Sequence, residues 1–205
     1  MALQEELESQ GNWLFRYRSF LPIAIVVVGW AMYLRRELHP EEFPLFLPEY
    51  EHLYLAVAMA VGLLGLAVRV YTVGFSPRNT SGRNTKVGQV ADTLNQTGIY
   101  SVVRHPLYLG NFLMWLGPAL VTANGWFILA FCFLYWVYYE RIMFAEEQFL
   151  RKKFGDVYLQ WSQGVPAFLP NFSNFISSNF PFSWKKVLKK EKNGLAALFL
   201  IFCLF

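Results

Sequence analysis

Four long apolar blocks are the feature that most constrains this chain. They cover about residues 13–34, 53–73, 107–123 and 126–139, and most charged residues fall in the stretches between them. A helix needs roughly 20 apolar residues to cross a bilayer, and the fourth block approaches that length because helix-like sequence continues through Glu140. The chain is 55% hydrophobic and only 16% charged, whereas soluble domains are about a quarter charged. This pattern is typical of a membrane protein.

These blocks predict an all-α fold, a polytopic transmembrane helix bundle of four or five spans that forms a single domain over residues 1–205. The pair Asn124-Gly125 is a turn signal, so the third and fourth spans should form a helical hairpin. Residues 194–205 are a fifth apolar stretch that is too short to cross alone. We expect them to be a truncated further span or a segment lying in the membrane interface.

The distribution of positive charge predicts the orientation. The link after the first block holds Arg35 and Arg36 among five acidic residues, and the other Lys and Arg residues fall on the opposite side of a four-span bundle. Since cytoplasmic loops are rich in Lys and Arg, we expect both termini to be cytoplasmic. The acidic first residues do not resemble a signal peptide, and a bacterial inner membrane is the expected location. The lysine run at 185–192 favours contact with anionic lipid and not with nucleic acid.

Polar residues gather where the third block begins. Pro106 suits the first turn of a helix, which places Arg104 and His105 at its N-terminus. Free backbone N–H groups and the helix dipole favour an anion there, such as a carboxylate or a phosphate. Farther along, Gly110 and Gly117 would let a neighbouring helix approach closely. The hairpin brings this helix start to the same depth as the acidic residues after the fourth block, which predicts a polar site.

Two adjacent carboxylates after the fourth block have different neighbours. Glu147 precedes Arg151 by four residues, which predicts a solvated pair on the helix surface. Glu146 has no basic partner along its own helix and shares its side with apolar residues. A carboxylate in that setting needs a distant partner or a ligand, so we expect Glu146 to bind the ligand.

The remaining reactive side chains are less specific. Glu140 has no local partner and could meet Arg69 or Arg104, either in a structural ion pair or in catalysis. Cys132 and Cys203 lie inside apolar blocks and have no metal-ligand spacing. No metal site is predicted.

Several short motifs together resemble one known family. They are Gly98-Ile99-Tyr100, Arg104-His105-Pro106 with Tyr108 and Gly110, Glu146-Glu147, and Phe154-Gly155 with Tyr158. At this spacing they resemble the isoprenylcysteine carboxyl methyltransferase and phospholipid methyltransferase superfamily of integral membrane methyltransferases, over a core of roughly residues 85–170. The resemblance implies an enzyme that uses S-adenosylmethionine to methylate a carboxylate, phosphate or amine on a lipid or lipid-linked acceptor. Its partners would be that acceptor and membrane lipids, and its oligomeric state is left open.

The resemblance also implies which residues form the site. The cofactor would occupy a pocket at the cytoplasmic face lined by Thr93, Leu94, Asn95, Tyr100, His105, Pro106, Leu107, Tyr108 and Glu146. Arg104, Glu140 and Arg141 are the candidates for handling the acceptor. Family members place an arginine just upstream of the glutamate pair; here Arg141 is displaced by about one residue and Ile142 occupies the matching place. This departure leaves the acceptor open.

Two other functions compete with methyl transfer. Membrane sterol and polyprenol reductases, which use NADPH, share the Arg-His-Pro-x-Tyr-x-Gly segment. They tend to carry Asn-Tyr and Gly-Glu within it, where this chain has Leu107-Tyr108 and Gly110-Asn111. A non-enzymatic membrane scaffold would explain the apolar blocks but not the polar stretch at 85–100. Methyl transfer is therefore the preferred hypothesis.

Overall fold

The fold is a bundle of helices with one helix lying across it. The computed structural model describes residues 2–18, 20–43, 48–77 and 89–204. Its α-helices are α1 (Leu3–Tyr17), α2 (Leu21–Leu38), α3 (Glu51–Phe75), α4 (Pro106–Val121), α5 (Gly125–Phe154), α6 (Asp156–Gly164) and α7 (Trp184–Leu204). Four short 3-10 turns lie between them, at Pro40–Glu42, Pro48–Tyr50, Ile99–Ser101 and Phe172–Asn174. Within the described ranges the chain forms no β-strand, only an isolated bridge between Gly98 and Ile176, and the predicted all-α fold is confirmed.

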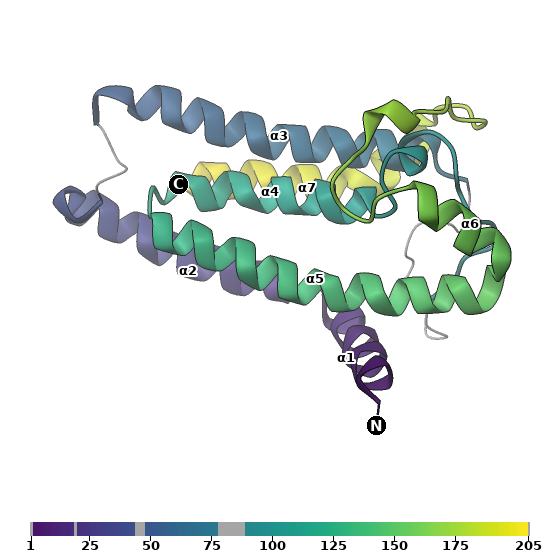
Figure 1. Ribbon diagram of the computed structural model, residues 1–205. Coiled ribbons are helices and arrows are strands. Elements are labelled where there is room, and N and C mark those ends of the chain that lie inside the picture. The colour runs from purple at the N-terminus through teal and green to yellow at the C-terminus, as the bar shows by residue number, and fades with distance from the viewer. Residues whose placement is uncertain (1, 19, 44–47, 78–88, 205) are drawn as a thin grey trace.

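The long helices α2, α3, α4, α5 and α7 share one approximate direction, while α1 leaves the bundle at a steep angle (Figure 1). Two of them, α3 and α5, are long and apolar enough to cross a membrane, and α4 is a shorter apolar helix. The predicted hairpin is present, because α4 and α5 are joined at residues 122–124, where the Asn124 side chain accepts a hydrogen bond from the Phe127 N–H. The predicted number of four or five spans stays a prediction.

The first apolar block does not form one helix. Trp13 belongs to α1, and a separate helix, α2, begins at Leu21. Pro22 lies in the first turn of α2, where its missing N–H is tolerated, whereas within a continuous helix it would remove a hydrogen bond and clash. The expected first span at 13–34 was therefore wrong at its start.

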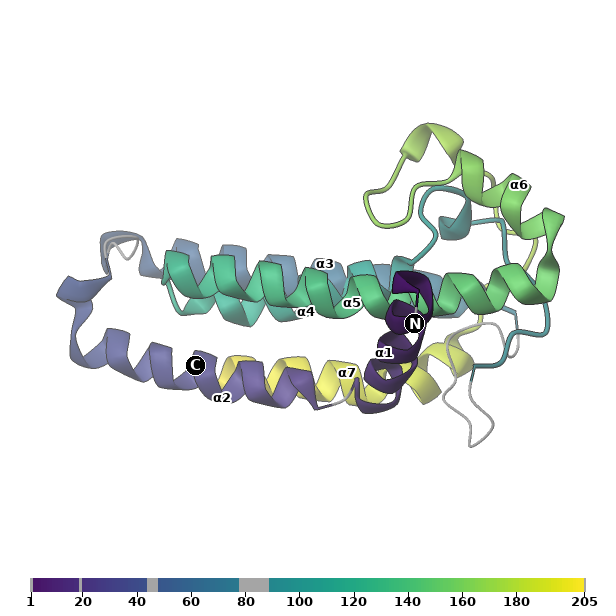
Figure 2. The same ribbon diagram turned by 60° about the horizontal axis from the view of Figure 1, so that its bottom comes forward.

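The apolar stretch at 194–205 is the second half of a longer helix. Because α7 begins at Trp184 it has 21 residues, and Leu198 is buried where α7 packs along α3. From the end of the bundle that carries α6, α7 runs back toward the opposite end (Figures 1 and 2). This path does not support the expectation that both termini face the same side.

Glycines bring α3 and α4 into close contact, as predicted for Gly110 and Gly117. A Cβ atom placed on Gly117 would lie 2.7 Å from the Ala58 carbonyl oxygen, and one on Gly110 would lie 2.9 Å from that of Gly65. On the α3 side, a Cβ atom on Gly65 would lie 2.4 Å from the Met114 nitrogen. Such distances require backbone to shift, so these positions fix the separation of the two helices.

We predict that Gly65→Ala lowers the thermal unfolding midpoint in detergent. Overpacking costs about 1–3 kcal/mol, which corresponds to about 3–10 °C for a protein of this size. Gly164→Ala is the matched control, because a Cβ atom there meets nothing within 4 Å. An unchanged midpoint in Gly65→Ala would mean that the close α3–α4 contact is not a packing constraint.

Candidate functional site

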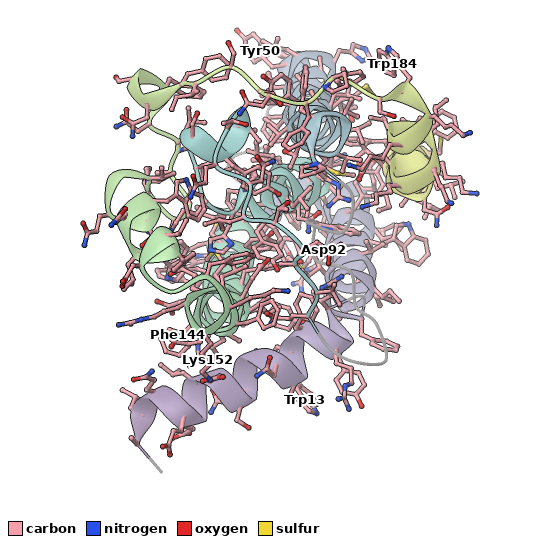
Figure 3. The ribbon with its side chains drawn as sticks, turned by 90° about the vertical axis from the view of Figure 1, so that its right-hand side faces the viewer. Trp13, Tyr50, Asp92, Phe144, Lys152 and Trp184 are labelled. Carbon is pink, nitrogen blue, oxygen red and sulfur yellow. The ribbon has the colours of Figure 1, made fainter. Side chains whose placement is uncertain are left out.

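A cavity of about 890 Å³ lies at the end of the bundle where α4 begins and α6 follows α5. Figure 3 looks onto this end, with α7 on one flank and α1 beneath. The wall comes from α3, the segment at 89–95, the start of α4, the second half of α5, α6 and α7. Every residue predicted to bind the cofactor lines it: Thr93, Leu94, Asn95, Tyr100, His105, Pro106, Leu107, Tyr108 and Glu146.

The segment before α4 is held by the segment after α6. The backbone N–H groups of Arg104 and His105 donate to the carbonyl oxygens of Pro166 and Ala167, at 2.9 and 3.1 Å. Between the same two segments, Gly98 forms an isolated β-bridge with Ile176. The φ angle of Gly98 is positive, at 63°. These backbone hydrogen bonds hold Arg104 and His105 at the N-terminus of α4, independently of their side chains.

A chain of polar contacts joins the start of α4 to α5. The Tyr108 hydroxyl donates to Glu146 Oε2 at 2.8 Å, and His105 Nδ1 lies 3.6 Å from the same oxygen. On the other side of the ring, His105 Nε2 lies 2.9 Å from Glu147 Oε1, which also accepts from Arg104 Nε at 3.0 Å. The imidazole of His105 therefore lies between two carboxylates, and it is only 4% exposed.

These contacts decide the protonation of His105. Burial alone would lower the pKa of its imidazole, but hydrogen bonds and charge from Glu146 and Glu147 outweigh burial and raise the pKa above the ordinary value. Burial, followed by the charge of Glu147, likewise raises the pKa of the Tyr158 hydroxyl, and that of Tyr100 is raised by burial and by Glu146. The two carboxylates therefore shift His105 toward its imidazolium form relative to a free imidazole, and the raised pKa values favour the neutral hydroxyls of Tyr158 and Tyr100.

The predicted surface pair between Glu147 and Arg151 was wrong. Glu147 turns inward to Arg104 and His105, whereas Arg151 is exposed. An exposed pair four residues apart contributes only about 0.3–0.5 kcal/mol, and a charge-assisted contact away from water is stronger. Sequence spacing along one helix could not reveal partners that α4 supplies.

Arg104 lines the cavity, but most of its guanidinium is already engaged. Besides Glu147, it donates from one terminal nitrogen to the carbonyl oxygens of Ser162 and Val165, at 2.6 and 3.1 Å. These carbonyls lie at the C-terminal end of α6. Arg104 thus ties α6 to the start of α4 and to α5.

Glu140 and Arg141 lie outside the cavity. Glu140 is exposed on α5, on the same side as the exposed Val137, and it forms no ion pair with any described residue. The Arg141 side chain donates to Gln10 of α1 at 2.9 Å and to the Val137 carbonyl oxygen. The expected pairing of Glu140 with Arg69 or Arg104 was wrong, because both arginines have other carboxylates.

The partner of Arg69 is Glu191, a residue that no sequence pattern singled out. Two nitrogens of Arg69 donate to the Glu191 carboxylate at 2.8 and 2.9 Å, and a third donates to Asn111. Glu191 is only 4% exposed. This pair joins α3, α4 and α7 beside the cavity, and its signal in the sequence was a lone acid within a lysine run.

Two further cavity residues were also missed. Gln89 Oε1 and Trp161 Nε1 are buried and have no hydrogen-bond partner within the described ranges, and both residues line the cavity. Because a buried polar atom without a partner costs free energy, the pair indicates a polar ligand that accepts from Trp161 and donates to Gln89. No spacing rule singled them out.

Comparison with known proteins identifies relatives of the segment that carries the site. Residues 56–157 match the family model of phospholipid methyltransferases. The protein-S-isoprenylcysteine O-methyltransferase of Schizosaccharomyces pombe is 37% identical over 73 residues, 36% of this chain and 31% of that protein. Protein-S-isoprenylcysteine O-methyltransferase B of Arabidopsis thaliana is 37% identical over 74 residues, 36% of this chain and 37% of that protein. The matches thus span about a third of the length of these curated relatives.

A solved structure shares the fold. The eukaryotic intramembrane Ras methyltransferase, an isoprenylcysteine carboxyl methyltransferase, superposes with a TM-score of 0.55 over 75% of this chain and 53% of that one, at 20% identity. This likeness shows a shared fold, and α3 and α5 in the described part of the chain are long and apolar enough to cross a membrane. The family model, the curated relatives and this solved structure bear out the resemblance of the chain to the isoprenylcysteine carboxyl methyltransferase and phospholipid methyltransferase superfamily.

Proposed function

We propose that the chain transfers a methyl group from S-adenosylmethionine to a lipid or lipid-linked acceptor, in a cavity at the cytoplasmic face of a membrane. The observation that carries the proposal is that residues from separate segments of the chain line the same cavity. The residues assigned to the cofactor pocket come from the segment at 89–95, the 3-10 turn Ile99–Ser101, the start of α4 and the middle of α5, and all of them line one cavity. The curated relatives described above are named as methyltransferases.

The cavity suits this cofactor in size and in polar groups. Pockets for small ligands measure about 300–1,000 Å³, and a cavity of about 890 Å³ has room for a cofactor and part of an acceptor. The unpartnered atoms of Gln89 and Trp161 match a ligand that carries both donors and acceptors. S-Adenosylmethionine has an adenine, two hydroxyls, an ammonium and a carboxylate, and it supplies an electrophilic methyl group on a sulfonium.

In this reaction the protein's role is to position the methyl donor and the acceptor. Methyl transfer is an in-line displacement, so the rate depends on holding donor and acceptor in one geometry. Glu146, fixed by Tyr108 and His105, has lone pairs left to accept from an ammonium or a hydroxyl. The rings of Tyr100 and Tyr108 line the same cavity and can face a cationic sulfonium.

The roles of the other candidates follow from their contacts. We assign Arg104 to positioning, because its guanidinium holds Glu147 and the end of α6. Glu140 and Arg141 have no part in the proposed site, since neither lines the cavity.

The side of the membrane that the site faces and the source organism are each addressed by one observation. The lysines of α7 that line the cavity support a cytoplasmic position under the positive-inside rule. The curated relatives named above come from eukaryotes, so they give no support to the expected bacterial inner membrane.

We predict that Glu146→Gln weakens binding of S-adenosylhomocysteine about tenfold to a hundredfold, because a hydrogen bond to a charged group contributes about 1.5–3 kcal/mol. Calorimetric titration of the purified protein measures this. Glu140→Gln is the matched control, since it removes the same charge from the same helix outside the cavity. Binding of NADPH in place of S-adenosylhomocysteine would move the chain to the reductases, and binding of neither would favour the scaffold.

We predict that the contribution of His105 to the free energy of unfolding decreases as pH rises. The folded-state pKa of His105 lies above its unfolded value of about 6.5, so the imidazolium stabilises fully below about pH 6.5 and is lost as pH rises through the folded pKa. Thermal midpoints of the wild type and His105→Gln, measured from pH 6 to 9, should converge toward high pH. His52→Gln, which removes an exposed imidazole from α3 outside the cavity, is the matched control. A constant gap between wild type and His105→Gln would contradict the role of charge.

A further inference from the structure

The helix α1 lies across the bundle and not along it. It leaves the bundle at a steep angle in Figure 1, and Figure 3, which looks along the long helices, shows α1 over its full length. In a bilayer crossed by the long helices α3 and α5, α1 therefore runs roughly parallel to the membrane surface. Its depth relative to that surface follows from the part of α5 that it contacts.

Contacts with α5 place α1 where the apolar part of α5 ends. The Tyr138 hydroxyl donates to the Leu14 carbonyl oxygen at 3.1 Å. Toward the N-terminus of α1, the Lys152 ammonium donates to the Glu8 carboxylate at 2.6 Å. Tyr138 belongs to the apolar first half of α5, which covers residues 125–139, whereas Lys152 belongs to the charged second half. The helix α1 therefore spans the boundary between the two halves.

The charges of α1 are distributed in a way that suits this boundary. Its first part, residues 3–9, contains three glutamates and no cation, whereas residues 10–18 contain Arg16 and Arg18 and no acid. The acidic part lies beside Lys152 of α5, and the cationic part lies beside Tyr138. Since cations are attracted to anionic lipid headgroups, the second part of α1 is the part suited to the membrane surface.

Exposed aromatic rings lie on this second part of α1 and just beyond it. Trp13, Tyr17 and Phe20 follow one another with ring centroids 4.8 and 6.1 Å apart, and we call these three residues the aromatic ridge. They are 60%, 40% and 65% exposed. Figure 3 shows Trp13 on the side of α1 away from the bundle. Tryptophan and tyrosine gather at the interface between hydrocarbon and water, where the ring is buried and its polar atom stays hydrated.

The aromatic ridge continues into an apolar side of α2. Ile23, Val27 and Leu34 follow Phe20 at intervals of three, four and seven residues, so they lie on one side of the helix. All three are exposed, like the aromatic ridge, in the part of the chain that the structure describes. A continuous exposed apolar surface of this length is typical of contact with lipid.

The other side of α1 faces the bundle and the cavity. Phe15 and Arg18 both line the cavity, and the Arg18 guanidinium carbon lies 4.0 Å from the centre of the Phe15 ring. Gly11 packs so closely against the Arg141 backbone of α5 that a Cβ atom at this position would overlap it. The helix α1 therefore carries cavity-lining residues on one side and the aromatic ridge on another.

We propose that α1 is an interfacial helix whose aromatic ridge binds the headgroup region of the bilayer, and that this contact holds α1 against the bundle with Phe15 and Arg18 in the cavity wall. A lipid surface fits better than a protein partner, because polarity changes along α1 in step with the change from charged to apolar sequence along α5. A bilayer imposes one polarity gradient on both helices, whereas a second protein would not require it. The inference goes beyond methyl transfer and is independent of the ligand that the cavity binds.

The first test measures the environment of the aromatic ridge in lipid nanodiscs. The natural cysteines are removed by Cys132→Ala and Cys203→Ala, and a nitroxide label is then attached in turn to Trp13→Cys, Tyr17→Cys and Phe20→Cys. Glu6→Cys, in the acidic part of α1, reports water, and Phe133→Cys, at an exposed position in the apolar half of α5, reports lipid. Collision rates with oxygen and with a water-soluble nickel chelate are measured at each label.

We expect the ratio of oxygen to nickel collisions at all three ridge positions to lie between those of the two controls, and several-fold above the ratio at Glu6. Ridge labels with the ratio found at Glu6 would place α1 in water and overturn the inference. Labels shielded from both reagents would mean that protein, such as a second copy of this chain, covers the aromatic ridge, and this result overturns the inference as well.

The second test asks whether the contact holds α1 in place. In nanodiscs, Trp13→Ser should speed backbone hydrogen exchange in α1 several-fold, because α1 loses an anchor in the membrane. Trp126→Ser is the matched control, since it removes a tryptophan that is 81% exposed at the opposite end of the bundle, and it should leave exchange in α1 unchanged. Exchange in α1 that is the same in Trp13→Ser as in the wild type overturns the holding role. Both tests use protein without a cavity ligand, so their outcomes do not depend on the proposed function.

Discussion

The site depends on the carboxylate of Glu147 more than on any other group. One of its oxygens accepts from Arg104 and faces His105, and Arg104 in turn holds the last carbonyls of α6. The start of α4, the middle of α5 and the end of α6 therefore meet at a single negative charge. With His105 fixed on one side by Glu147, its other nitrogen faces Glu146 and keeps that carboxylate turned toward the cavity. A change at Glu147 would release all of these elements together.

Much of the candidate site could be predicted from local sequence. Pro106 marks the start of a helix, the Asn124-Gly125 turn folds α5 back along α4, and this hairpin alone brings His105 and Tyr108 to the depth of Glu146. The apolar blocks likewise predicted α3, α4 and the first half of α5, because a span of the bilayer needs a long apolar run. These features need only the periodicity of one helix or the geometry of one turn.

Contacts between distant segments could not be predicted in that way. Glu147 was assigned to Arg151 because spacing along a helix says nothing of cations on another helix. Glu140 was placed in the site because it has no partner along its own helix, and Arg141 because of the family motif. The outward face of α5 is as rich in aromatic and apolar residues as its buried face, so amphipathicity did not place the two residues outside. The pairing of Arg69 with Glu191 joins residues 122 positions apart, and only the three-dimensional fold relates them.

That pairing also has a consequence for biosynthesis. Arg69 lies near the end of α3, and its carboxylate partner arrives only after α4, α5, α6 and the first turns of α7 have been translated. Of the polar partners of Arg69 described above, α3 and α4 supply only Asn111, and without α7 one side of the cavity is missing. Docking of α7 would neutralise the arginine and complete the cavity in the same event. Because synthesis runs from the N-terminus, a complete cavity requires that α7 has been made and has joined the bundle.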